Sequence, residues 1–238
     1  MSSAGVDPAA VAERLDRLRD RITRAGGHDV RILAVTKTWG LDAIRAAVAA
    51  GCDAVGENYA QELVAKLDGE VDLPAVHFIG RLQTNKVRLV APFVTVYETV
   101  DRESLAAEIA RRAPGATVLV QASPDGDPTK GGCALASVPA LVDRCRDLRL
   151  DVRGLMIVGP TEGGAEAARS GFRATRALVE NLGLEVCSMG MSDDLEIAVQ
   201  EGSTEVRVGS ALFGPRAPRR ADGSAATTLP GSTSDTGR

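Results

Sequence analysis

Short apolar runs alternate with longer amphipathic stretches along most of this chain, and that alternation limits the possible folds more than any other feature. Eight such runs can be counted, and each is followed by a turn. They span residues 31–36, 54–56, 76–79, 94–97, 117–121, 152–157, 185–188 and 205–208. Apolar runs of this length, bounded by turns, predict buried β-strands.

The stretches between the runs predict helices at residues 41–50, 60–67, 85–90, 102–112, 138–148, 165–182 and 193–201. An extra amphipathic helix is expected at residues 9–25, where Val11, Leu15, Leu18 and Ile22 recur at helical spacing. Strands that alternate with helices pair in parallel through crossover helices. The pattern therefore predicts an α/β fold, a single-domain (β/α)8 TIM-like barrel with an extra N-terminal helix. An open doubly wound sheet is the alternative.

The barrel is expected to occupy residues 1–216. The remaining segment, residues 217–238, is rich in Gly, Ser, Thr and Pro and has a single leucine. Such a composition buries too little apolar surface to offset the entropy lost on ordering. We expect a disordered C-terminal tail.

Bulk properties restrict location and partners. The formal net charge of −4 argues against a nucleic-acid partner. No apolar run is long enough to span a membrane, and the N-terminus lacks the basic and apolar segments of a signal peptide. The four cysteines are scattered singly, as in a reducing compartment, and match no zinc module. These features predict a cytoplasmic protein without a metal ion.

Lys37 directly follows the first apolar run. A lone lysine is usually a solvated surface charge, but active sites of α/β barrels lie where strands end. We therefore expect Lys37 at the mouth of the barrel. A desolvated lysine loses its proton more easily and attacks carbonyl groups, so Lys37 is a candidate for Schiff-base formation.

Small residues follow the seventh and eighth runs, each time before a predicted helix. Ser192 lies in the first of these loops, and Gly209 and Ser210 lie in the second. Backbone N–H groups at a helix start, together with serine hydroxyls, favour an anion, and barrels often bind phosphate in these two loops. The sequence predicts a phosphate site here.

Arg207 lies between Val206 and Val208 in the eighth run. Because strand side chains alternate, Arg207 should point into the barrel if the valines pack under the helices. A buried guanidinium is costly unless an anion meets it. Phosphate is one candidate for that anion, and an internal carboxylate such as Glu57 or Glu205 is the other.

A reactive lysine beside a phosphate site suits pyridoxal phosphate, which has both an aldehyde and a phosphate. A Schiff-base aldolase acting on sugar phosphates needs the same two features. The residues alone therefore do not distinguish a pyridoxal-phosphate protein from an aldolase. His77 lies within the third apolar run and, taken alone, is typical of a core histidine. Asn58 and Gln83 are, by default, loop or capping residues.

Ordered motifs over residues 9–216 resemble those of the pyridoxal 5′-phosphate homeostasis protein family, whose members are also described as alanine racemase N-terminal-domain-like. The motifs occupy residues 34–38, 56–59, 77–86, 154–156, 188–196 and 202–214. The resemblance implies a fold-type III barrel that carries pyridoxal 5′-phosphate on Lys37. It implies that the phosphate is surrounded by Ser192, Arg207, Gly209 and Ser210, and that the cofactor face is lined by Asn58, His77 and Met156.

Two positions depart from common family forms. Trp39-Gly40 stands where many members have a proline, and Arg81 stands where many have histidine or proline. Both lie in loops expected near the mouth. They bear on the shape of the entrance and not on cofactor attachment.

We expect a monomeric binding protein that stores, buffers or delivers pyridoxal 5′-phosphate without efficient turnover, and hence without catalytic residues. Apo forms of pyridoxal-phosphate enzymes are its candidate recipients. An amino-acid racemase is the rival function. Such a racemase adds a β-domain whose tyrosine supplies the second base from a partner subunit, and this chain is expected to lack that domain.

Overall fold

The computed structural model of the protein describes residues 5–127, 129–160 and 162–214. Its strands are all parallel and form a closed barrel in sequence order, because β1 pairs with β2 on one side and with β8 on the other. The strands are β1 (Arg31–Val35), β2 (Ala54–Glu57), β3 (Ala75–Phe78), β4 (Val96–Val100), β5 (Thr117–Ala122), β6 (Asp151–Ile157), β7 (Val186–Ser188) and β8 (Glu205–Val208). The predicted barrel is confirmed, and the open sheet is wrong. The predicted tail, residues 217–238, lies outside the described residues.

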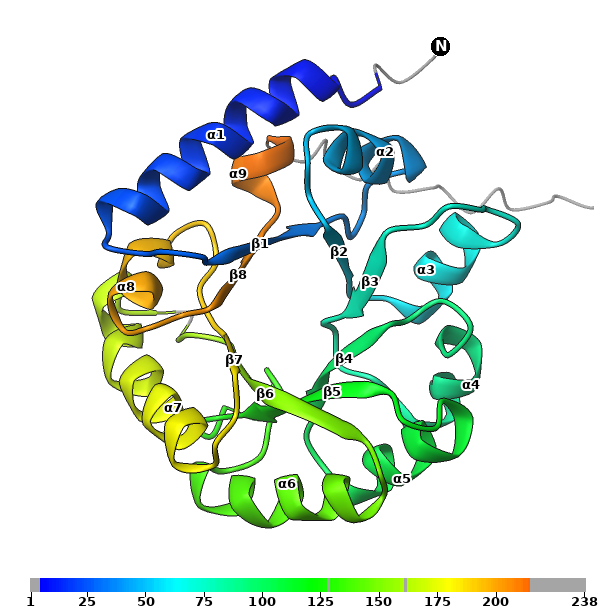
Figure 1. Ribbon diagram of the computed structural model, residues 1–238, viewed down its shortest axis with the longest axis vertical. Coiled ribbons are helices and arrows are strands. Elements are labelled where there is room, and N and C mark those ends of the chain that lie inside the picture. The colour runs from blue at the N-terminus through cyan, green and yellow to red at the C-terminus, as the bar shows by residue number, and fades with distance from the viewer. Residues whose placement is uncertain (1–4, 128, 161, 215–238) are drawn as a thin grey trace, which may run out of the picture.

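Helices surround the ring of strands (Figure 1). They are α1 (Pro8–Arg24), α2 (Leu41–Ala49), α3 (Ala60–Leu67), α4 (Val87–Val90), α5 (Glu103–Arg112), α6 (Val138–Asp147), α7 (Arg169–Asn181), α8 (Leu195–Gln200) and α9 (Ser210–Phe213). Short 3-10 turns precede α4, α6 and α7, namely η1 (Thr84–Lys86), η2 (Leu135–Ser137) and η3 (Ala165–Ala168). No helix among these residues is both long and apolar enough to cross a membrane.

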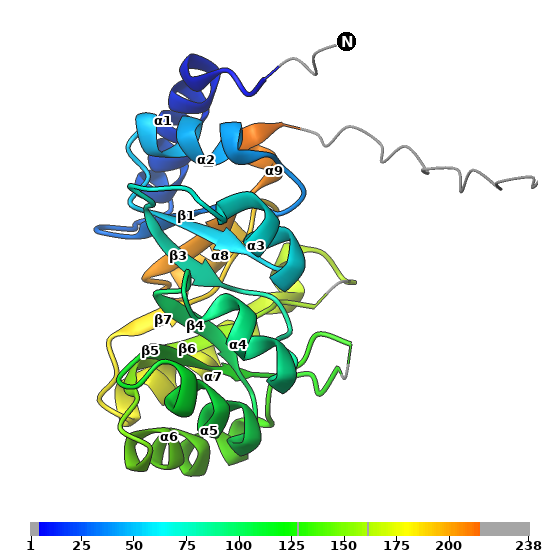
Figure 2. The ribbon, with the colours of Figure 1, turned by 90° about the vertical axis from the view of Figure 1, so that its right-hand side faces the viewer.

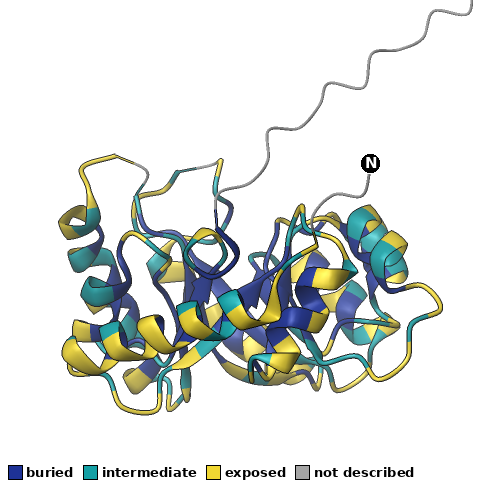
Figure 3. Ribbon diagram, turned by 90° about the horizontal axis from the view of Figure 1, so that it is seen from above, coloured by how far each residue is buried: buried dark blue, intermediate teal, exposed yellow. Residues whose placement is uncertain are grey.

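The main core lies between the strands and the helices. Outward-facing strand residues such as Val55, Val118 and Val206 are fully buried there. Figure 3 shows the strands in the colour of buried residues, while the helices expose one face to solvent. Aromatic residues make up only 3% of the chain, so this layer is filled mainly by Ala, Val, Leu and Ile.

Helix α1 is the predicted extra helix, and it lies against the outside of the barrel beside α2 and α9 (Figure 1). Asp7 caps its start by accepting a hydrogen bond from the Ala9 N–H at 3.0 Å, and Pro8 occupies the first turn. Its buried residues are the four predicted from helical spacing, Val11, Leu15, Leu18 and Ile22.

Strand β4 differs most from its predicted position. The apolar run at residues 94–97 predicted the strand, but the strand continues to Val100 through Glu98 and Thr99, both buried. A strand can continue through polar residues if the barrel interior supplies hydrogen-bond partners for their side chains. The apolar pattern then ends before the strand does. The displaced boundary therefore marks a polar region inside the barrel.

Candidate functional site

A cavity of about 400 Å³ opens at the carboxyl ends of the strands. Its wall contains seven of the eight predicted cofactor contacts, namely Lys37, Asn58, Met156, Ser192, Arg207, Gly209 and Ser210. These residues are far apart in the chain, so barrel closure brings them together. The loops after β5 and β6 extend on this side, on the right in Figure 2, and Thr129 and Lys130 of the first loop also line the cavity.

Lys37 is half-buried in the turn that follows β1. The next residue, Thr38, has a φ of +67°, which is unfavourable for a β-branched side chain. Its backbone N–H donates a hydrogen bond to Glu62 of α3. This bond helps to hold the turn that carries Lys37.

A buried ion pair lies under the same turn. Lys66 Nζ of α3 donates to Glu57 Oε1 at 2.5 Å and to the Thr36 carbonyl at 3.0 Å, and Thr36 Oγ1 donates to Glu57 at 2.6 Å. The Glu57 side chain is fully buried and that of Lys66 is 5% exposed. Burial raises the pKa of Glu57, and the Lys66 ammonium opposes the rise. The pair fixes the residue directly before Lys37.

The two loops predicted to bind phosphate meet at the cavity. The hydroxyl oxygens of Ser192 and Ser210 are 3.3 Å apart. The first loop is held by Asp194, which accepts from the Met191 N–H at 2.6 Å, and by Arg21 of α1, which donates to the Ser192 carbonyl at 2.9 Å. Because α8 and α9 have only six and four residues, individual N–H and hydroxyl groups, not a long helix dipole, would bind an anion here.

Arg207 points into the barrel, as its alternation with two valines predicted. Val206 and Val208 are buried in the outer core. The guanidinium of Arg207 donates to Ser188 Oγ at 2.8 Å and to the Ile157 carbonyl at 2.7 Å. Arg207 is thus held in the wall of the cavity by neutral groups of β6 and β7.

The carboxylates considered as partners for Arg207 contact other cations. Glu57 pairs with Lys66, and Glu205 lies 3.4 Å from Arg31. A third carboxylate, Glu98 of β4, reaches Arg207 through Ser188, because Ser188 Oγ donates to Glu98 Oε2 at 2.7 Å.

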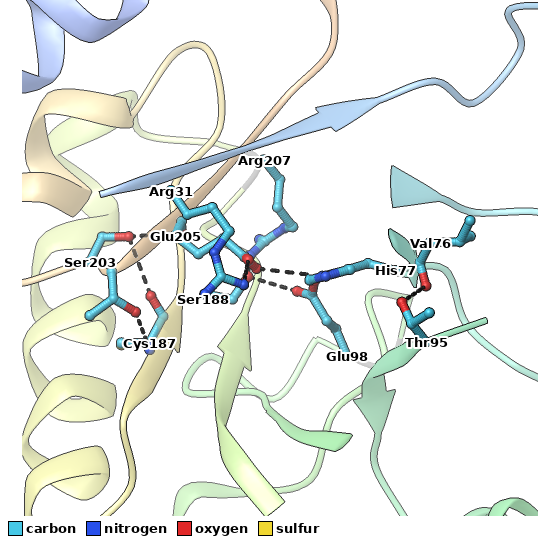
Figure 4. A network of polar contacts seen from close by, with 11 residues as sticks. Arg31, Val76, His77, Thr95, Glu98, Cys187, Ser188, Ser203, Glu205 and Arg207 are labelled. Atoms are coloured by element: carbon cyan, nitrogen blue, oxygen red, sulfur yellow. Dashed lines mark hydrogen bonds and ion pairs between the residues drawn. The ribbon is translucent and has the colours of Figure 1, made fainter. Parts of the chain in front are cut away.

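His77 does not line the cavity that holds the other predicted residues. It lies deeper in the barrel, with Nδ1 2.6 Å from Glu98 Oε1, and lines a second cavity of about 240 Å³. Residues from the amino ends of β1, β4, β5, β6, β7 and β8 also line that cavity, which places it at the opposite mouth. Figure 4 shows His77 beside Glu98, Glu205 and Arg207. The predicted contact of His77 with a cofactor gains no support from this position.

The titrating groups of this interior cluster influence one another. Burial acts to lower the pKa of His77, but the hydrogen bond and charge of Glu98 outweigh it and raise the pKa. Burial acts to raise the pKa of Glu98, but His77 and Arg207 lower it. Burial, reinforced by the Glu98 charge, raises the pKa of Glu205 to about 7. The shifts of His77 and Glu98 favour the charged forms of that pair, whereas the shift of Glu205 favours its protonated form.

Two residues that shape the site were absent from the sequence candidates, Lys66 and Glu98. Lys66 stands in an amphipathic helix, where a lysine is normally solvated. Glu98 follows the apolar run that predicted β4. The only available signal was a charged residue at a position that continues the inward alternation of a strand.

A larger cavity of about 570 Å³ adjoins the first and shares Asn58 and Arg81 with it. Asn58 Oδ1 is buried and has no hydrogen-bond partner in the described part of the chain. Gly80 allows the backbones to approach here, because a Cβ at this position would lie 2.0 Å from the Asn58 carbonyl oxygen. Asn58 thus presents an unsatisfied acceptor at the wall of the site.

The two departures from common family forms have identifiable places. The Trp39 ring packs against Phe213 of α9 with ring centroids 5.7 Å apart, which links the Lys37 turn to the helix that begins at Ser210. Arg81 lines both cavities. Arg81 therefore lies at the entrance, as its loop predicted, whereas Trp39 packs on α9.

Fold and site together define a class, the (β/α)8 barrels with a lysine at the carboxyl-end mouth beside serine-bearing loops. Comparison with known proteins narrows the class. The domain described as "Alanine racemase, N-terminal domain" matches residues 6–217. A protein of Pseudomonas aeruginosa named pyridoxal phosphate homeostasis protein is 40% identical over 222 residues, which cover 87% of this chain and 96% of the relative.

Solved structures agree. PipY of Synechococcus elongatus, in a structure without pyridoxal phosphate, superposes with a TM-score of 0.77 at 33% identity and covers 86% of this chain and 100% of PipY. The structure of PipY with pyridoxal phosphate bound has a TM-score of 0.74 at 32% identity, with the same coverage. This chain belongs to the pyridoxal phosphate homeostasis family of alanine racemase N-terminal-domain proteins.

Proposed function

We propose that this protein binds pyridoxal 5′-phosphate covalently at Lys37 and holds it for storage or delivery. The observation that carries the proposal is the meeting of Lys37 with Arg207, Ser192 and Ser210 in one cavity. About 400 Å³ lies in the usual range for small-molecule sites. When bound, the cofactor supplies an aldehyde that a lysine amine attacks.

The residues present fit such a group. Lys37 would hold the aldehyde carbon, and Ser192, Gly209 and Ser210 would donate to the phosphate, with Arg207 adding positive charge. Asn58 and Met156 would face the ring. The buried Asn58 Oδ1 offers an acceptor that a polar group of the ligand would satisfy.

The relatives support this assignment. PipY has been solved with pyridoxal phosphate bound, and the Pseudomonas aeruginosa relative is named for pyridoxal phosphate homeostasis. Both are matched over nearly their whole length. The sugar-phosphate aldolase reading has no such support.

Efficient racemisation is not part of the proposal. It needs a second acid or base opposite Lys37. The two tyrosines of the chain are Tyr59, which lines the adjoining cavity, and Tyr97, which is buried in the outer core. Lys130 does line the site, but Asp125 and Asp127 bind its ammonium at 2.8 and 3.5 Å.

These two aspartates keep the Lys130 amine charged. Burial acts to lower its pKa, but their hydrogen bonds and charges outweigh burial and raise it. A charged lysine cannot accept a proton, and its raised pKa makes it a weak proton donor. We therefore expect the protein to hold its cofactor without supplying the second base that rapid racemisation needs.

The first experiment tests attachment. The purified protein, loaded with pyridoxal 5′-phosphate, should show a visible band that borohydride abolishes, and peptide mapping should then place the label on Lys37. Lys37→Ala should lose the band, while the matched control Lys130→Ala, which also removes an amine from the cavity wall, should keep it. A label mainly on Lys130 or Lys86 would show that the assignment is wrong.

The second experiment tests the role. The loaded protein is incubated with L-amino acids to follow α-hydrogen exchange and chirality, and separately with an apo pyridoxal-phosphate enzyme to follow reactivation. We expect reactivation without appreciable racemisation. Turnover in the ordinary enzyme range of about 1–10³ s⁻¹ would instead establish a racemase.

A further inference from the structure

The interior cluster of His77, Glu98 and Glu205 is not used by the proposed cofactor site. Its three residues come from β3, β4 and β8 and are at most 3% exposed. Their potential ligand atoms all lie within 4.8 Å of one another. Figure 4 shows the three side chains converging inside the barrel.

One oxygen of this cluster lacks a partner. Glu205 Oε1 forms no hydrogen bond with any residue that the structure describes, although Glu205 is only 1% exposed. His77 Nδ1 lies 3.9 Å from this oxygen. A buried carboxylate oxygen without a partner is costly, so the position favours a proton or a cation.

Glu98 and Glu205 each use one carboxylate oxygen for an outer contact, and the other oxygen of each faces His77. Glu98 Oε2 accepts from Ser188, and Glu205 Oε2 faces Arg31 at 3.4 Å. The two Oε1 atoms face His77 Nδ1 instead, at 2.6 and 3.9 Å. Outer contacts that hold ligand side chains in this way are typical of metal sites.

The donor set is suited to a divalent transition metal. One imidazole nitrogen and two carboxylate oxygens are zinc ligands at roughly 2.0–2.2 Å. Around a four-coordinate ion, ligand atoms at these bond lengths lie about 3.3–3.6 Å apart. His77 Nδ1 and Glu98 Oε1 would therefore move apart from 2.6 Å, and His77 Nδ1 and Glu205 Oε1 would approach from 3.9 Å. The proton of the His77–Glu98 hydrogen bond would be released to solvent.

The cluster is also reachable. His77 and Glu205 line the cavity of about 240 Å³ at the amino-end mouth. That volume exceeds the share of several waters, about 30 Å³ each, so an ion could keep water ligands. Asp151 and Glu185 line the same cavity together with Arg31 and Arg153, so the approach has charges of both signs, and Arg153 pairs with Glu185.

We propose that His77, Glu98 and Glu205 form a binding site for a divalent transition metal ion, for which zinc is the probe. The sequence alone indicated no metal, because the three ligands stand on separate strands at no recognisable spacing. The site lies at the mouth opposite Lys37 and uses none of the residues that line the cofactor cavity. A negative result for the metal site would therefore leave the cofactor proposal unchanged.

The test uses the full chain, stripped of metal and free of cofactor, titrated with zinc chloride by calorimetry and analysed for bound metal after dialysis. We expect one zinc ion per chain. Glu205→Gln and His77→Gln should each weaken binding by at least about tenfold, the loss expected even for outer contacts of a metal site. The matched control Glu185→Gln removes a carboxylate from the same cavity but not from the cluster, and it should bind like the parent.

Circular dichroism melts establish that each variant is folded, and the two ligand variants act as independent tests. Cobalt(II) substitution provides a second readout, because ligand-field bands report coordination directly. These bands should be present in the parent and absent from both ligand variants. No zinc uptake by the parent, or equal uptake by the parent and both ligand variants, would overturn the proposal and leave the cluster as a proton-sharing pair of carboxylates.

Discussion

Lys66→Met removes the charge from the buried pair beneath the Lys37 turn while keeping a long apolar side chain in place. In the native protein Lys66 Nζ is 2.5 Å from Glu57 Oε1, and neither side chain is more than 5% exposed. The variant leaves the Glu57 carboxylate buried without its cation. Thr36 Oγ1 remains as a hydrogen-bond donor to it.

In the variant, Glu57 can either stay charged or take up a proton. The outcome with the smaller free-energy cost determines how much stability is lost. An unpaired buried charge costs roughly 3–5 kcal/mol. Taking up a proton costs about 1.4 kcal/mol for each pH unit above the ordinary pKa of 4.5. At pH 7 this amounts to at most about 3.4 kcal/mol, and at pH 5.5 to about 1.4 kcal/mol. We therefore expect a loss near 3 kcal/mol at pH 7 that shrinks in acid.

The direction of the pH dependence follows from proton uptake. Burial raises the pKa of Glu57 in the folded variant above its unfolded value, so folding binds a proton. The stability from that proton is fully present below about pH 4.5 and is lost as the pH rises through the folded pKa. The gap between native protein and variant should consequently widen from pH 5.5 to pH 7.

Urea unfolding followed by circular dichroism at the two pH values measures this gap. The matched control is Arg45→Met, which breaks the Arg45–Glu70 pair of 3.0 Å on the surface, where Arg45 is 70% exposed; it should cost less than about 1 kcal/mol. The double variant Lys66→Met/Glu57→Gln should regain most of the loss. A cost below about 1 kcal/mol at pH 7, or no change with pH, would refute the reasoning.

Three further predictions concern the cofactor site and the barrel wall. Arg207→Ala should weaken retention of pyridoxal 5′-phosphate about ten- to a hundredfold in equilibrium dialysis, because a hydrogen bond to a charged group is worth roughly 1.5–3 kcal/mol; an unchanged affinity would remove Arg207 from the site. Unphosphorylated pyridoxal should bind far more weakly than its phosphate, and equal affinity would contradict a phosphate site at Ser192 and Ser210. Gly154→Ala should lower the melting temperature by roughly 4–8 °C, because the new Cβ would lie 1.9 Å from the Val186 carbonyl oxygen and the resulting overpacking costs about 2 kcal/mol of stability. An unchanged melting temperature would show that β6 and β7 can separate freely.

Local patterns were sufficient to determine the elements of this protein. The period of the apolar residues distinguished strands from helices, and the eight alternations left few topologies open. The place of Lys37 after β1 and the inward direction of Arg207 also followed from local order, because the end of a strand and the alternation of its side chains are properties of a short segment. Barrel closure then brings seven of the eight predicted cofactor residues into one cavity, including Asn58 and Met156, which the family resemblance had implied.

Contacts between distant strands were decided only by the tertiary structure. His77, Glu98 and Glu205 meet because barrel closure brings β8 within reach of β3 and β4, and no spacing in the chain encodes that closure. From the sequence, Lys66 is expected to be a solvated helix residue. Only the packing of α3 over Glu57 shows that it forms a buried ion pair. A charged side chain in an amphipathic pattern has the same sequence signature whether it faces water or a buried partner. The interior polar network, and with it the position of His77 away from the cofactor cavity, thus depended on packing between strands and helices that sequence patterns do not specify.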